Sequence, residues 1–202
     1  MKRTRLTPLC VLFGVAALLA FAPSAPAATG GACQLKGTAS FGTGLGTTDK
    51  PFDYSFHGDL TNCQSNVAGA PTSGTVSAGE VYTDPATGKQ YQMPRSQGNG
   101  SCGSSTTSGT ALAAWADGTR TVVSYTTSGA AAAVTLQGSV VDSVFVPPVN
   151  PSDPPLQLTT TRYSGSTAVG GLVFEASPQD CASQTGVLAA GIEGAIGLGN
   201  QN

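Results

Sequence analysis

The sequence has little charge and a single histidine, and both shortages count against particular functions. Only 10% of the 202 residues are charged. Catalytic zinc sites commonly use two or three histidines, and the facial iron triad uses two. The chain also has no Gly-x-x-x-x-Gly-Lys phosphate loop, no strand–Gly-x-Gly-x-x-Gly–helix unit and no Asp-x-Asp-x-Asp-Gly calcium loop. We therefore expect no metal and no cofactor.

Basic residues are also scarce once the N-terminal segment is set aside. Three of the nine Lys and Arg residues, Lys2, Arg3 and Arg5, lie in the first five positions. Without them the chain has six basic and eleven acidic residues, a net charge of −5. Binding to nucleic acid or to an anionic membrane surface needs clustered basic residues. We expect neither partner.

The N-terminus has the three-part layout of a secretory signal peptide. Basic residues precede the uninterrupted apolar run 9–22, and small residues ending in Ala25-Pro26-Ala27 follow it. The run is short for a stable transmembrane span. We predict cleavage after Ala27, no stable membrane insertion afterwards, and a secreted or cell-wall-associated protein. A lipoprotein would instead begin at Cys33, but Gly30-Gly31-Ala32 lacks the expected aliphatic residue.

The cysteines indicate a covalent framework. Cys10 leaves with the signal peptide, and four remain: Cys33, Cys63, Cys102 and Cys181. An even number in an exported chain predicts two disulfides. Four cysteines allow three pairings, and the spacing leaves them open. The absence of any Cys-x-x-Cys pair argues against zinc.

Almost every segment alternates apolar and polar residues and is bounded by Gly, Pro, Asn or Asp. That pattern predicts β-strands. About ten short strands in one domain, residues 28–202, predict an antiparallel β-sandwich. The expected segments include 33–41, 52–60, 74–83, 131–146 and 185–199, with residues 97–105 as a loop held by Cys102 and residues 147–155 as a proline-rich surface connection.

The strongest local signal is the hairpin in residues 110–126. Asp117-Gly118 is a preferred two-residue turn, and such a turn places Trp115 opposite Arg120 on the outer face. The guanidinium could then lie over the indole ring. We treat Trp115 and Arg120 as the candidate ligand-binding residues, but we favour the plainer interpretation that Trp115 is a single aromatic residue covering the hairpin or filling the core.

The only histidine, His57, shares one face of a predicted strand with Asp53, Ser55 and Asp59. Side chains on one strand face stand parallel, whereas a catalytic triad needs the imidazole aimed at the serine. No Gly-x-Ser-x-Gly elbow occurs. We therefore read this as a solvated strand face and assign no catalytic residue.

The sequence favours a non-catalytic binding or structural module of the cell envelope or medium. Its expected partners are a cell-wall or extracellular polysaccharide, or a secreted protein. Two alternatives remain. A secreted hydrolase would pair carboxylates across a cleft, with Glu80, Glu175 and Glu193 as candidates. A protease inhibitor would present the disulfide-anchored loop around Cys102.

Five segments resemble an uncharacterised family of secreted, Ala/Gly/Thr-rich β-proteins of actinobacteria: "CQLKGTASF", "FDYSFHGDLTNC", "GSCG", "AAWADGTRTVVSY" and "SPQDC". The resemblance covers the chain beyond the signal peptide. It implies that all four cysteines belong to the disulfide framework, and it carries over no catalytic residue. Cys33–Cys63 and the alternative Cys63–Cys102 with Cys33–Cys181 remain nearly equal expectations.

Overall fold

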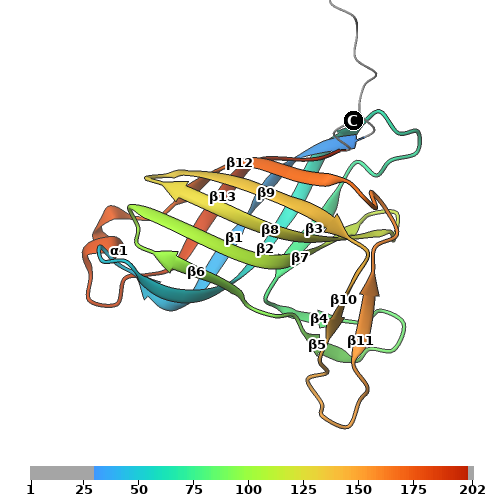
Figure 1. The fold of residues 1–202 in the computed structure, drawn as a ribbon, viewed down its shortest axis with the longest axis horizontal. Coiled ribbons are helices and arrows are strands. Elements are labelled where there is room, and N and C mark those ends of the chain that lie inside the picture. The colour runs from blue at the N-terminus through green and yellow to red at the C-terminus, as the bar shows by residue number, and fades with distance from the viewer. Residues whose placement is uncertain (1–29, 200–202) are drawn as a thin grey trace, which may run out of the picture.

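The computed structural model describes residues 30–199, which form an all-β structure built around a closed, eight-stranded antiparallel barrel (Figure 1). The predicted signal peptide, residues 1–27, lies outside the described residues. Within the described part no helix is long and apolar enough to cross a membrane. The barrel wall consists of β1 (Gly30–Leu45), β2 (Lys50–Ser65), β3 (Gly74–Ala78), β6 (Ser96–Gly100), β7 (Ser104–Trp115), β8 (Arg120–Ala130), β9 (Ala133–Val141), β12 (Thr167–Glu175) and β13 (Val187–Gly199).

The predicted sandwich is wrong, because the sheet closes on itself. The strands follow the order β1-β13-β12-β9-β8-β7-β3-β2, and β2 pairs again with β1. A barrel and a sandwich share the same alternation of inward apolar and outward polar residues, so the alternation does not distinguish them. Closure leaves β1 and β2 with a hydrogen-bonding partner on each side, and neither forms an exposed edge.

One place in the wall is filled by two separate strands. β3 and β6 both lie between β2 and β7, β3 toward one end and β6 toward the other. The chain leaves the wall after Ala78 and returns at Ser96. Gly79 turns it outward with φ of +68°, and a Cβ at this glycine would lie 3.0 Å from the Cα of Arg95. The excursion therefore begins and ends at neighbouring points.

The excursion packs with a second hairpin to form a small lobe beside the barrel (Figure 1). It contains β4 (Val81–Thr83) and β5 (Gln90–Gln92), and the other hairpin contains β10 (Ser143–Val146) and β11 (Leu156–Thr159). Tyr91, Met93, Val146 and Leu158 are buried against the outward side chains of Leu112 and Val122, which lie on β7 and β8. The proline-rich residues 147–155 connect β10 to β11, as an irregular connection was expected to do.

The two disulfides join Cys33 to Cys63 and Cys102 to Cys181. The first links β1 to β2, and the second links the β6–β7 turn to the short helix α1 (Pro178–Ala182). The expected loop at residues 97–105 is wrong, because β6 and the start of β7 pair across it as a hairpin. Likewise, the single strand expected over residues 131–146 is interrupted at Asp142, between β9 and β10.

Candidate functional site

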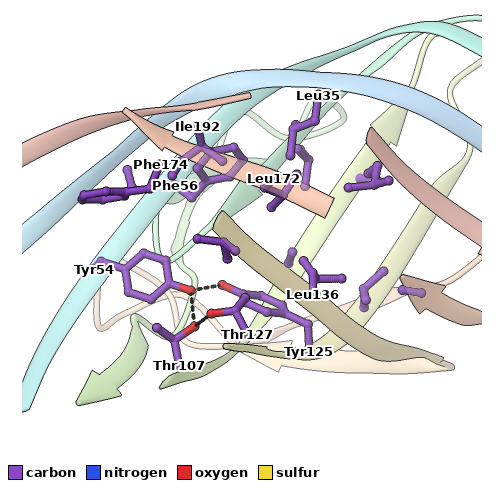
Figure 2. A pocket seen from close by; sticks show the side chains of 18 of the residues that line it. Leu35, Tyr54, Phe56, Thr107, Tyr125, Thr127, Leu136, Leu172, Phe174 and Ile192 are labelled. Carbon is purple, nitrogen blue, oxygen red and sulfur yellow. Dashed lines mark hydrogen bonds between the residues drawn. The ribbon is translucent and has the colours of Figure 1, made fainter. Parts of the chain in front are cut away.

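The interior of the barrel contains a cavity of about 150 Å³. Alternation along each strand points one set of side chains inward, and almost all of them are apolar. Figure 2 shows Leu35, Phe56, Leu172, Phe174 and Ile192 gathered on one side of the space, facing a group of hydroxyl-bearing side chains. The cavity is therefore an apolar space with one polar wall.

Small side chains leave this space unfilled. Ala39, Ala111, Ala113 and Ala168 all point into the barrel and are buried. A barrel of eight strands is just wide enough either to be filled by its own side chains or to hold one small ligand. Alanine at four inward positions leaves space that the side chains do not fill.

The exposure of inward-pointing side chains changes along the barrel axis. At the end where β7 meets β8, Leu60, Val76 and Trp115 are buried. Toward the β8–β9 turn, Thr127 and Val134 also line the cavity but keep accessible surface. The cavity is thus covered by buried side chains at the Trp115 end, whereas Thr127 and Val134 keep some accessible surface near the β8–β9 turn.

Five hydroxyl groups form an unbranched hydrogen-bonded chain, and the four residues other than Ser96 line the cavity as its polar wall. Ser96 Oγ lies 2.8 Å from the Tyr125 hydroxyl, which lies 2.8 Å from the Tyr54 hydroxyl. The Tyr54 hydroxyl lies 3.0 Å from Thr107 Oγ1, and Thr107 Oγ1 lies 2.7 Å from Thr127 Oγ1 (Figure 2). β2, β6, β7 and β8 each contribute to it. These strands are neighbours in the wall, so the hydroxyl chain connects four adjacent strands.

The polar wall carries no net charge. Burial is the main cause that raises the pKa of Tyr125 far above its ordinary value, and the adjacent Tyr54 adds to it. The phenol therefore stays protonated at physiological pH. Among the described residues that line the cavity, none is Lys, Arg, His, Asp or Glu. A charged ligand would lose its hydration there without gaining a counter-ion.

Trp115 seals the opposite end of the cavity. Its indole Nε1 donates to Thr121 Oγ1 at 2.9 Å, and its ring meets Tyr163 edge-on with centroids 5.6 Å apart. Outside this plug, Arg162 donates to Asp117 Oδ2 at 2.6 Å and to Thr119 Oγ1 at 3.0 Å. The closed end is thus held by side-chain contacts from the β7–β8 hairpin and the loop before β12.

The candidate pair Trp115 and Arg120 is not brought together. Trp115 is 6% exposed and lines the cavity, whereas Arg120 lies on the outer wall and donates to the Tyr82 hydroxyl of the lobe at 3.3 Å. The predicted register is wrong by one residue, because Ala114 rather than Trp115 pairs with Arg120. A one-residue shift moves a side chain to the other face of the sheet.

The turn explains this shift. The loop has three residues, 116–118, rather than two: Gly118 N donates to Trp115 O, and Trp115 N donates to Thr119 O, both at 2.9 Å. Gly118 has φ of +82°, the left-handed conformation that a three-residue hairpin loop with a G1 bulge requires. The same Asp-Gly sequence is compatible with either turn, so the loop sequence alone does not distinguish them.

His57 lies on the outer face of β2, as expected, with 59% of its side chain exposed. Its Nδ1 is 3.6 Å from Glu80 Oε2, which is too long for a hydrogen bond. Asp53 instead forms an ion pair with Arg95, and Ser55 is buried where the lobe leaves the wall. These contacts do not form a triad.

The other acids also lie on the outer wall. Glu193 forms an ion pair with Lys36 across β1 and β13, and Glu175 is near enough to help raise the pKa of that lysine. The hydrogen bond from Lys36 to Glu193 is the larger cause of that rise. Within residues 30–199, no three His, Cys, Asp or Glu side chains gather as metal ligands.

The hydroxyl chain was not identified from the sequence. Thr127 could have been found, because it follows Tyr125 by two positions and so shares its face. Ser96 and Thr107 could not, because their strands are short or were expected to begin elsewhere. Their approach depends on β6 inserting between β2 and β7.

No protein-family model, curated protein or solved structure matches this chain.

Proposed function

We propose that this protein is an exported, non-catalytic binding protein that holds one small, mainly apolar molecule inside its barrel. The observation that carries the proposal is the cavity of about 150 Å³ with its apolar lining. In another protein, an engineered apolar cavity of about this volume stays free of water and binds benzene. The expected ligand is therefore of that size.

The cost of an empty cavity supports this function. Cavities in protein cores cost about 24 cal/mol per Å³, so 150 Å³ corresponds to about 3–4 kcal/mol of lost stability. Native domains are stable by only about 5–15 kcal/mol. A protein with such a cavity loses a large part of its free energy of unfolding, and a ligand that fills the cavity restores part of that loss.

The disulfides and the predicted signal peptide together support the proposed export. Two disulfides are typical of an oxidising environment. Export itself rests on the pattern of residues 1–27. The polysaccharide partner now lacks its proposed anchor, since an indole inside the barrel presents no flat surface to a sugar ring.

Trp115 provides the test, because it is the only tryptophan and lines the cavity. Methylenecyclohexane, a compact apolar molecule, is titrated into the mature protein while tryptophan emission and the thermal midpoint are recorded. We expect a saturable change in emission and a midpoint that rises with ligand concentration, because only the folded state binds.

Two variants locate the site. Ala168→Leu adds bulk to an inward position and should abolish the emission change while the protein stays folded by circular dichroism. Ala195→Leu makes the same change on the exposed outer side of β13 and should bind as the wild type does. Absence of saturable binding by the folded wild type, or equal binding by both variants, would overturn the proposal.

A further inference from the structure

The direction of the hydroxyl chain determines what it offers a ligand. Ser96 is fully buried, and in the described part of the chain its Oγ has one hydrogen-bond partner, Tyr125. Leaving a buried hydroxyl proton without an acceptor costs about 1–3 kcal/mol. Ser96 therefore donates to Tyr125, and the Tyr125 hydroxyl must direct its own proton to Tyr54.

The donor and the acceptor of each remaining hydrogen bond can then be assigned in turn. Each hydroxyl carries one proton, so Tyr54, which accepts from Tyr125, donates to Thr107, and Thr107 donates to Thr127. Four bonds use four of the five protons. The fifth belongs to Thr127, whose side chain lines the cavity and is only partly buried.

We propose that Thr127 donates a hydrogen bond into the cavity and that the ligand is an uncharged cyclic or branched molecule bearing one acceptor, such as a ketone. The hydroxyls of the chain polarise one another in the same direction, which strengthens the donor at its end. Apolar side chains on the facing wall accommodate the rest of the molecule (Figure 2).

The uncharged lining of the cavity argues against a ligand that carries a charged group. A carboxylate or an ammonium group placed beside Thr127 would be desolvated, and no side chain of opposite charge lines the cavity among the described residues. An apolar ring without an acceptor fits the space but leaves the Thr127 proton unused. We therefore expect the affinity to be highest for a neutral molecule with an acceptor, lower for a neutral molecule without one, and lowest for a charged molecule.

The inference rests on the proposed function, and matched probes separate the two. Cyclohexanone and methylenecyclohexane have the same shape and differ only in a carbonyl oxygen against a methylene group. We expect cyclohexanone to bind about tenfold more tightly, as one hydrogen bond would give. Cyclohexylammonium and cyclohexanecarboxylate should show no saturable binding at the same concentrations.

Thr127→Val keeps the shape of the side chain and removes its donor. It should weaken cyclohexanone binding about tenfold and leave methylenecyclohexane binding unchanged, and Thr127→Ser should restore the preference. Thr126→Val, on the exposed outer face of β8, is the matched control and should leave both affinities unchanged.

The outcomes are distinguishable. If neither neutral probe binds, the proposed function fails. If both bind equally to the wild type, or if Thr127→Val lowers both affinities alike, the cavity is a binding site but the assignment of Thr127 as donor is wrong. Tight binding of either charged probe would likewise overturn the assignment.

Discussion

The indole of Trp115 and the hydroxyl of Thr121 are joined inside the barrel by a hydrogen bond of 2.9 Å across the β7–β8 hairpin. Thr121 is fully buried and passes its own proton to the carbonyl oxygen of Arg162 at 2.9 Å. One threonine thus links the residue that closes the cavity to the loop that covers it.

Replacing Thr121 by valine should therefore destabilise the protein. The substitution preserves the side-chain shape but leaves the Trp115 Nε1 proton and the Arg162 carbonyl without this partner. We expect a loss of about 1–3 kcal/mol in the free energy of unfolding, measured in urea. Thr126→Val on the outer face should cost less than about 0.5 kcal/mol. Equal effects of the two changes would show that the buried hydrogen bond contributes nothing.

The indole should also be shielded from water. At 6% exposure, Trp115 should emit at short wavelength and be quenched weakly by iodide, and unfolding in guanidinium should abolish both properties. The reference is free tryptophan in the same buffer. Quenching of the folded protein as strong as that of the reference would place the indole outside the barrel and restore the predicted register.

The two disulfides should contribute unequally. Cys33–Cys63 closes a separation of 30 residues, and Cys102–Cys181 closes one of 79. The chain-entropy relation gives about 3.6 and about 4.5 kcal/mol respectively. Denaturation of the two double alanine variants should show the larger loss for Cys102→Ala/Cys181→Ala. The opposite order would mean that native-state contacts around Cys33–Cys63 outweigh loop entropy.

Acid should weaken the closed end of the barrel. The side-chain hydrogen bond from Thr119 is the main cause that lowers the pKa of Asp117, with the Thr119 backbone and Arg162 adding to it. A lowered pKa means that the carboxylate stabilises the fold above its ordinary pKa of 3.8 and loses this contribution as pH falls below that value.

Thermal unfolding midpoints measured from pH 6 to pH 2.5 test whether stability falls with pH in this way. Asp117→Asn should start from a lower midpoint at pH 6 and lose less than the wild type on acidification, so the two curves converge. Asp59→Asn, which removes an exposed acid from the outer face of β2, is the control. Parallel curves for wild type and Asp117→Asn would contradict the prediction.

Local pattern predicted much of the strand content but not the closure. Alternation placed His57 outside and Tyr54 inside β2 correctly, because period two depends only on neighbouring residues. Closure depends on β1 pairing with β13, and Cys33 lies opposite Ile196 there, far away in sequence. No feature of either strand alone distinguishes that pairing from the edge of a sandwich.

The prediction of the candidate site failed for a similar reason, because local sequence did not determine which face or strand its residues occupy. Trp115 was selected as an aromatic residue on the predicted outer face of the hairpin, whereas the structure places it on the opposite face, at the cavity. Its position depends on one extra loop residue, and the hydroxyl chain depends on the placement of β6. The resemblance to exported actinobacterial proteins stays a prediction.

The split strand of the wall has a consequence for how the molecule can vary. The chain leaves the wall after Ala78 and returns at Ser96, at adjacent points, while β3 and β6 keep their pairing with both neighbours. The length and sequence of the inserted segment are therefore largely independent of the geometry of the wall. Insertions, deletions or exchanges between Ala78 and Ser96 should therefore leave the shape of the cavity unchanged.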